Sequence, residues 1–155
     1  MTSHFKLDSA ILCAAVLCSL PAAAEDVPQR AEAAATMKRA VTFFREKVSA
    51  EGGYLWRYSE DLALREGEEK ATASTAWLQP PGTPAVGEAY LKAYERANER
   101  YLLDAAVQTA GALVKGQLQS GGWDNSIEVD PEKRKAHAYR ADGTAAGGRT
   151  RNTTT

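Results

Sequence analysis

The sequence predicts an all-α fold of antiparallel helix repeats, about three helices long, with short extended aromatic segments between them. Apolar residues recur at steps of three and four in residues 37–48, 86–97 and 103–114, which is the spacing of one helix face. A glycine pair followed by an aromatic residue stands at residues 52–54 and again at residues 121–123. The two pairs are 69 positions apart (121 minus 52), which indicates a weak internal repeat.

Residues 1–24 are predicted to be a signal peptide. A polar start, an apolar run over residues 10–20 and alanines up to Ala24 follow the tripartite secretory pattern, and the run is too short for a transmembrane helix. The alternative is a buried N-terminal helix. Cleavage after Ala24 predicts a periplasmic or secreted protein without membrane contact. Cys13 and Cys18 both lie in the removed segment, so the mature chain has no disulfide.

The first helix of the mature chain is predicted to begin near Pro28. Proline suits a first helical turn, and the alanine-rich residues 31–35 favour helix. The apolar stripe then continues through residues 37–48. Phe43 and Phe44 are interpreted as core residues of this helix.

Residues 54–58 alternate aromatic side chains with other residues, which predicts a short extended strand. Tyr54, Trp56 and Tyr58 are expected on one side of it. Three such rings can stack on sugars or cover the helix ends, and both interpretations stay open. Residues 59–74 are predicted to form a solvated loop or a frayed helix.

A proline-rich segment precedes the second predicted helix. Thr83 is expected to cap it, with Pro84 as its first residue. Gly87, Ala89 and Ala93 are small, so a neighbouring helix can approach closely.

A short turn is predicted between the second helix and the third. Asn98 ends the second helix and Tyr101 begins the third, so the two are expected to be antiparallel neighbours. Gly121 and Gly122 are expected to supply a left-handed cap at the end of the third helix. Trp123 is then expected to fold back over that end.

Composition excludes several functional classes. The chain carries 19 basic and 20 acidic residues, a net charge of −1, and no glycine-rich phosphate loop or zinc-ligand spacing. His4 and His137 are its two histidines, which disfavours a histidine-based site. Residues 133–151 are locally basic, but the predicted export argues against nucleic acid as a partner. Apolar helix faces without partners suggest that residues 25–155 are the N-terminal part of a longer domain.

Residues 82–91, 101–106 and 117–123 resemble α/α-toroid proteins, and more narrowly the pectate lyase (pectic acid lyase) family of exported bacterial proteins. The resemblance covers roughly residues 35–155. It implies a partial α/α toroid and the cleavage of polygalacturonate by β-elimination, with Ca²⁺ held by aspartates and an arginine as base. Gln117 followed by the glycine pair and Trp123 also resembles the QW motif of triterpene cyclases, another α/α toroid, so a toroid of that type is an alternative.

Acidic polysaccharide is therefore the expected partner. β-Elimination from a uronate needs a cation to neutralise the carboxylate and a base to remove the neighbouring proton. The catalytic base is expected beyond residue 155, so the chain alone is expected to be inactive. The predicted substrate-binding residues are Tyr54, Trp56, Trp123, Arg149 and Arg151, and the predicted metal ligand is Asp124. The alternatives are a turn-capping role for Asp124, a solvated loop for the arginines, and a non-catalytic α/α-toroid module that binds polysaccharide through Tyr54, Trp56 and Trp123.

Overall fold

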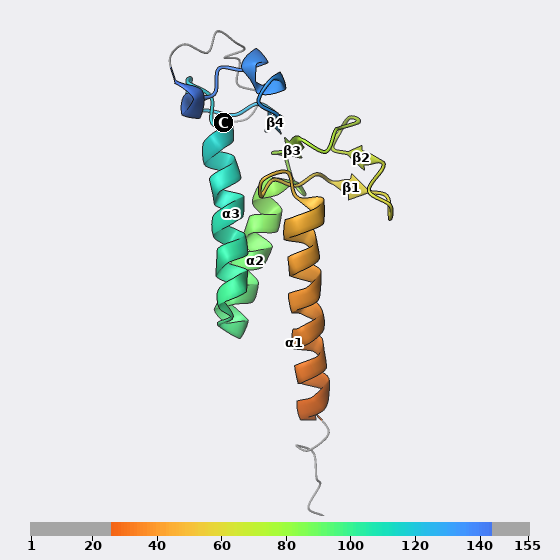
Figure 1. The fold of residues 1–155 in the computed structure, drawn as a ribbon. Coiled ribbons are helices and arrows are strands. Elements are labelled where there is room, and N and C mark those ends of the chain that lie inside the picture. The colour runs from red at the N-terminus through yellow and green to blue at the C-terminus, as the bar shows by residue number, and fades with distance from the viewer. Residues whose placement is uncertain (1–25, 144–155) are drawn as a thin grey trace, which may run out of the picture.

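The computed structural model describes residues 26–143, which form three α-helices and two small antiparallel sheets. The helices run beside one another, and the strands gather with the loops at one end of them, the upper end in Figure 1. We call this region the loop layer. The predicted all-α toroid is therefore wrong, and the fold is a small mixed α/β arrangement. The segments expected to link helix repeats pair with each other as short strands instead.

The first helix, α1, spans Asp26–Phe43 and continues into a π-helical turn, η1, over Phe44–Val48. Val41 and Val48 are buried, whereas Phe43 and Phe44 are 47% and 42% exposed. The prediction that both phenylalanines belong to the core is wrong. A π-helical turn holds more residues than an α-helical turn, so α-helical spacing no longer identifies the buried face from Phe44 onward.

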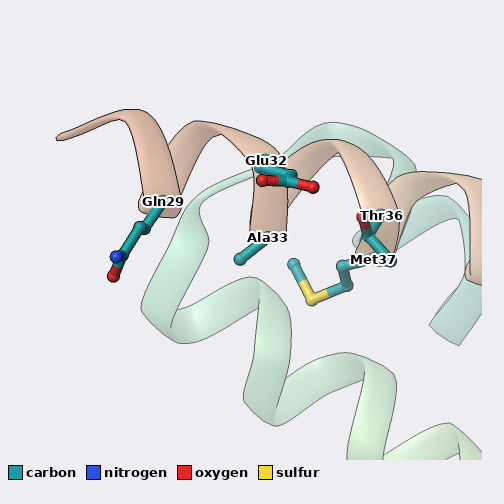
Figure 2. Close-up of a pocket in the computed structure, with 5 residues that line it drawn as sticks. All are labelled: Gln29, Glu32, Ala33, Thr36 and Met37. Carbon is teal, nitrogen blue, oxygen red and sulfur yellow. The ribbon is translucent and has the colours of Figure 1, made fainter. Parts of the chain in front are cut away.

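A groove of about 550 Å³ follows the first half of α1. Figure 2 shows the side chains that line it, with Met37 pointing toward the neighbouring helices. Met37 packs against the core at the far end of this groove. The lining residues all come from α1: Gln29, Glu32, Ala33, Thr36 and Met37.

The second and third helices, α2 (Thr83–Ala97) and α3 (Arg100–Gly116), form an antiparallel hairpin. Asn98 follows the last residue of α2 and ends the helix, as predicted. Its backbone is in the left-handed conformation, with φ at 52°. A Cβ added to Gly87 would lie 3.0 Å from Cγ2 of Thr109. The small residue therefore lets α3 approach closely, which confirms the predicted crowding of this helix pair.

Thr83 does not cap α2, contrary to the prediction. Gly82 occupies the N-cap position without a side-chain cap. The fully buried Thr83 hydroxyl instead donates to the Tyr54 carbonyl oxygen at 3.1 Å and accepts the Tyr54 N–H at 2.9 Å. Because buried backbone groups need partners, this hydroxyl binds the loop after η1 to the start of α2.

The first sheet is small and lies at the side of the loop layer. Strand β1 (Arg57–Tyr58) pairs antiparallel with β2 (Arg65–Glu66), placing Arg57 opposite Glu66. Tyr54 lies outside the strand, so the predicted single strand over residues 54–58 is shorter than expected. The segment predicted to be a solvated loop contributes β2.

The second sheet joins segments far apart in the chain. Strand β3 (Thr75–Trp77) pairs antiparallel with β4 (Ser126–Glu128). A Cβ added to Gly116, at the end of α3, would lie 2.3 Å from Cδ1 of Ile127. The missing side chain at Gly116 is thus what allows β4 to pack against the helix end.

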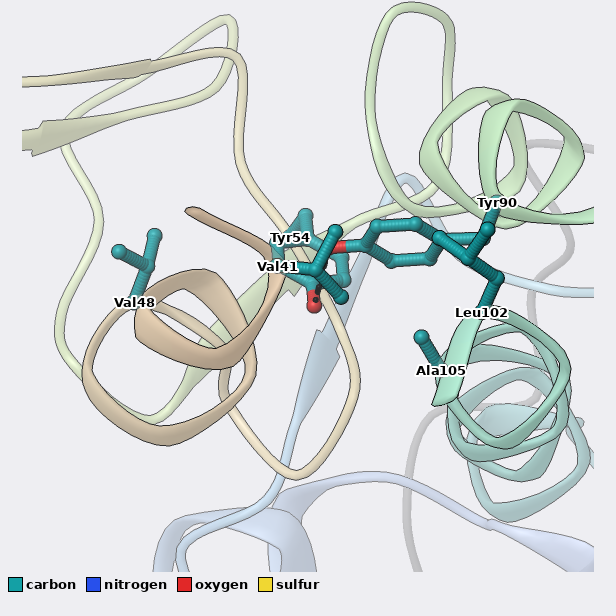
Figure 3. Close-up of a cluster of buried hydrophobic side chains, with 6 residues drawn as sticks. All are labelled: Val41, Val48, Tyr54, Tyr90, Leu102 and Ala105. Carbon is teal, nitrogen blue, oxygen red and sulfur yellow. Dashed lines mark hydrogen bonds between the residues drawn. The ribbon is translucent and has the colours of Figure 1, made fainter. Parts of the chain in front are cut away.

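Two buried clusters hold the fold together. The first lies among the three helices and the loop after η1 (Figure 3), and comprises Val41, Val48, Tyr54, Tyr90, Leu102 and Ala105. The second lies under the second sheet and comprises Ala76, Leu78, Leu118, Ile127 and Tyr139. The loop layer therefore has its own core, separate from the core of the helices.

The turn after α3 differs from the predicted cap. The helix ends at Gly116, and Gln117 is already extended. Gly121 has positive φ (+96°), but it lies in a turn that follows the helix. Its carbonyl oxygen accepts a hydrogen bond from the Gln117 side-chain amide at 2.8 Å. Gly52 has a similar φ of +94°, so the two glycine pairs share a local conformation. The elements after them differ, since one leads into the first sheet and the other into the second.

Candidate functional site

The predicted site residues that the structure describes all lie in the loop layer. Tyr54 and Trp56 follow η1, and Trp123 and Asp124 follow α3. The segment around Trp77 connects the two groups. The backbone N–H of Trp77 donates to the Tyr54 carbonyl oxygen at 2.8 Å, and the backbone N–H of Leu78 donates to the Asn125 carbonyl oxygen at 2.8 Å. The fold thus brings together two loops that are about 70 residues apart in the sequence.

Tyr54 lies inside the helix core. Its side chain is 2% exposed, and its hydroxyl shares a hydrogen bond of 3.1 Å with the hydroxyl of Tyr90 (Figure 3). Burial raises the pKa of both phenols, and the charge of Arg45 partly opposes that rise. Both hydroxyls therefore stay protonated at neutral pH. In this arrangement the Tyr54 ring packs the core and presents no face to a sugar.

Trp56 is only partly buried, and its ring is held in one orientation. The indole Nε1–H donates to the Gln79 carbonyl at 2.8 Å. The ring also meets Trp77 edge to face, with centroids 6.0 Å apart and an interplanar angle of 71°. Tyr54 and Trp56 therefore lie in different surroundings, and the predicted shared aromatic face does not form. Of the predicted pair Tyr54 and Trp56, only Trp56 remains partly exposed.

Trp123 folds back over the end of α3, as predicted. Its Nε1–H donates to the Leu113 carbonyl at 2.8 Å, in the last turns of the helix. The partly buried ring also packs against the cluster under the second sheet. These contacts tie the loop of Gly121 and Gly122 to α3, and they account for the position of Trp123 without a ligand.

Asp124 is 6% exposed, and its carboxylate accepts the N–H of Asn125 at 2.9 Å. This is the local turn contact that the sequence left as the alternative role. Ca²⁺ takes six to eight oxygen ligands. Within residues 26–143, no group of three or more His, Cys, Asp or Glu side chains is arranged to hold a metal ion. Calcium stays a prediction, and we derive no chemical step through it.

Several predicted features fall outside the described residues. They are the signal peptide of residues 1–24, together with Arg149 and Arg151. In the part of the chain that is described, no helix is both long and apolar enough to cross a membrane.

The structure adds residues that the sequence did not single out. Trp77 is 6% exposed, and its Nε1–H points to the Gln79 side-chain oxygen at 3.4 Å. It lies just before the proline-rich segment, which the sequence pattern indicates only as the boundary before the second helix. Arg45 donates through Nε to the side-chain oxygen of Gln108 at 2.9 Å, across 63 positions of sequence. No local sequence pattern predicts the contact between Arg45 and Gln108.

Comparisons with protein family models, with curated proteins and with solved structures find no match for this chain. The functional assignment therefore depends on the residues and their geometry, together with the sequence resemblance stated above.

Proposed function

We propose that this chain binds acidic polysaccharide as part of an exported lyase that cleaves polygalacturonate by β-elimination. The export signal, the motifs of residues 82–91 and 117–123, and the aromatic loop layer support the proposal. The described residues contribute substrate binding in this account. The base and the cation that β-elimination requires are not assigned to any of them.

The main support for the proposal is that Trp56 is partly exposed and is held in place by its neighbours. Its indole N–H donates to the Gln79 carbonyl oxygen, and its ring meets Trp77 edge to face. A ring fixed in this way loses little conformational freedom when a ligand stacks on it. Indole offers a large apolar face, and the C–H face of a sugar ring is its natural partner.

A second candidate is a polysaccharide-binding protein without catalytic activity. The fixed indole of Trp56 favours it equally, because stacking on sugar does not require cleavage. The two candidates differ only in the chemistry that follows binding. A test must therefore measure binding and cleavage separately.

Replacing Trp56 with Ala should weaken binding of oligogalacturonate about twofold to twelvefold, because an aromatic contact contributes about 0.5–1.5 kcal/mol beyond its buried area. The measurement is isothermal titration of the chain without its predicted signal peptide, residues 25–155. Trp56→Phe keeps an aromatic face and should retain most of the affinity. Val107→Ala, at a 62% exposed apolar residue of α3, serves as the matched control and should leave binding unchanged.

Cleavage is followed in the complete gene product as the ultraviolet absorbance of unsaturated products from polygalacturonate. The lyase proposal expects absorbance to rise, and a chelator of divalent metal to stop the rise. Binding without cleavage would support the second candidate. Equal affinities for wild type and Trp56→Ala, with unchanged melting temperatures, would contradict both.

A further inference from the structure

A polar concavity of about 170 Å³ lies between the end of α1 and the middle of α3. It is lined by Thr42, Arg45, Glu46 and Gln108. Sites for drug-sized ligands measure about 300–1,000 Å³, so this one suits a single sugar unit or a small anionic group. Its lining offers a hydroxyl, a guanidinium, a carboxylate and an amide.

The guanidinium of Arg45 has capacity left to bind a ligand. Its Nε–H is taken by the Gln108 side-chain oxygen at 2.9 Å. Within residues 26–143, its two terminal amino groups have no hydrogen-bond or ion-pair partner. Such a fork matches the two oxygens of a carboxylate, and charge-assisted bonds of this kind are about twice as strong as neutral ones.

Both members of the Arg45–Gln108 pair are held by surrounding backbone. Gly52, with φ at +94°, lies so close to α3 that an added Cβ would be 2.5 Å from the Gln108 carbonyl oxygen and 2.9 Å from its Cγ. The Ser49 hydroxyl donates to the Arg45 carbonyl at 2.8 Å and accepts the Gly52 N–H at 3.3 Å. The π-helical turn that carries Arg45 is itself a feature frequent at functional sites.

The positive charge of Arg45 affects the pKa of two neighbouring tyrosines, Tyr54 and Tyr90. Burial is the main cause of the raised pKa of Tyr90, and the positive charge of Arg45 lowers it in part, as it does for Tyr54. The carboxylate of Glu46 lies on the same concavity but on an exposed residue. Glu46 and Thr42 can accept hydrogen bonds from sugar hydroxyls, while the Gln108 amide nitrogen can donate them. A uronic acid offers both kinds of group, one carboxylate and several hydroxyls.

We propose that Thr42, Arg45, Glu46 and Gln108 form a subsite for one uronic acid residue, with the Arg45 guanidinium binding its carboxylate. The inference rests on the proposed function, which supplies an acidic polysaccharide as the ligand. It adds the residue that would recognise the acid itself.

The test compares trigalacturonate with its methyl ester, which keeps the hydroxyls and removes the charge. The wild-type chain should bind the acid about tenfold more tightly than the ester, the difference expected for one charge-assisted pair. Arg45→Gln should bind both equally. Arg39→Gln is the matched control, because Arg39 lies on α1, outside the concavity, where its Nη2 donates to the Thr36 hydroxyl oxygen at 2.9 Å; it should keep the preference. A thermal melt of each variant shows that it is folded.

A second measurement uses galacturonate monomer and the Arg45 Nε–H signal in a nuclear magnetic resonance titration of the wild-type chain. A saturable shift supports the subsite, even if the oligomer does not bind and the proposed function fails. Oligomer binding that depends on Trp56, combined with an unchanged acid preference in Arg45→Gln, overturns the subsite and leaves the proposed function standing. The absence of any galacturonate-induced shift at Arg45 also overturns the subsite.

Discussion

Replacing Tyr139 with Ala should lower the free energy of unfolding by about 3–5 kcal/mol, as large aromatic deletions in cores do. The residue is fully buried in the cluster under the second sheet. Its ring stacks on His137 with centroids 5.2 Å apart, and the Arg134 guanidinium lies 4.7 Å from its centroid. Its hydroxyl accepts the Glu128 N–H at 2.9 Å. Equilibrium unfolding in urea measures the change.

Tyr139→Phe separates the ring from the hydroxyl. It keeps the packing and leaves the Glu128 N–H without its partner, so it should cost about 1–3 kcal/mol. Equal costs for the two variants would show that the hydroxyl, and not the ring, holds the loop layer together. A cost below about 1 kcal/mol for Tyr139→Ala would contradict the assignment of this cluster as a core.

Replacing Trp77 with Ala should also cost about 3–5 kcal/mol and should weaken oligogalacturonate binding as well. The ring is 6% exposed and fills the space above Gly67, where an added Cβ would lie 2.2 Å from it. It is also the edge-to-face partner of Trp56. Removing it takes away the contact that fixes the Trp56 ring. Urea unfolding gives the stability, and titration below the melting temperature gives the affinity.

Trp77→Phe is the control for this pair of effects. It retains an aromatic ring in contact with Trp56 and should lose less stability and less affinity than Trp77→Ala. If Trp77→Ala is destabilised but binds oligogalacturonate as the wild type does, then Trp77 does not position Trp56. That result would confine Trp77 to a role in folding.

The helices could be predicted because their signals are local. Apolar spacing, the proline at position 84 and the left-handed Asn98 all act within a few residues of the element they define. The helix order and the hairpin of α2 and α3 follow from them. The exposed Phe44 shows the limit of these local signals, since the π-helical turn that begins there changes the spacing without a visible sequence signal.

The strands could not be predicted in the same way. Each has two or three residues, and β3 pairs with β4 across about 50 positions, with Thr75 opposite Glu128. Such pairing depends on the helices that bring the segments together. The fold class was therefore predicted wrongly, although residues 54–58 were recognised as extended and aromatic.

The candidate site was predicted in part. Alternation drew attention to Tyr54 and Trp56 equally, but burial separates them, because only the Trp56 ring remains partly exposed. Arg45 and Gln108 meet across 63 positions through the packing of α1 against α3. A contact between two helices, made by single polar side chains, leaves no periodicity to detect.

The most direct measurement of the central claim is the response of the Trp56 indole N–H signal to oligogalacturonate in a nuclear magnetic resonance titration. We expect that signal to shift in a saturable way. The side-chain amide of Asn98, at the opposite end of the helix hairpin, should not move. No shift at Trp56, or shifts confined to the Asn98 end, would contradict the claim that the loop layer binds acidic polysaccharide.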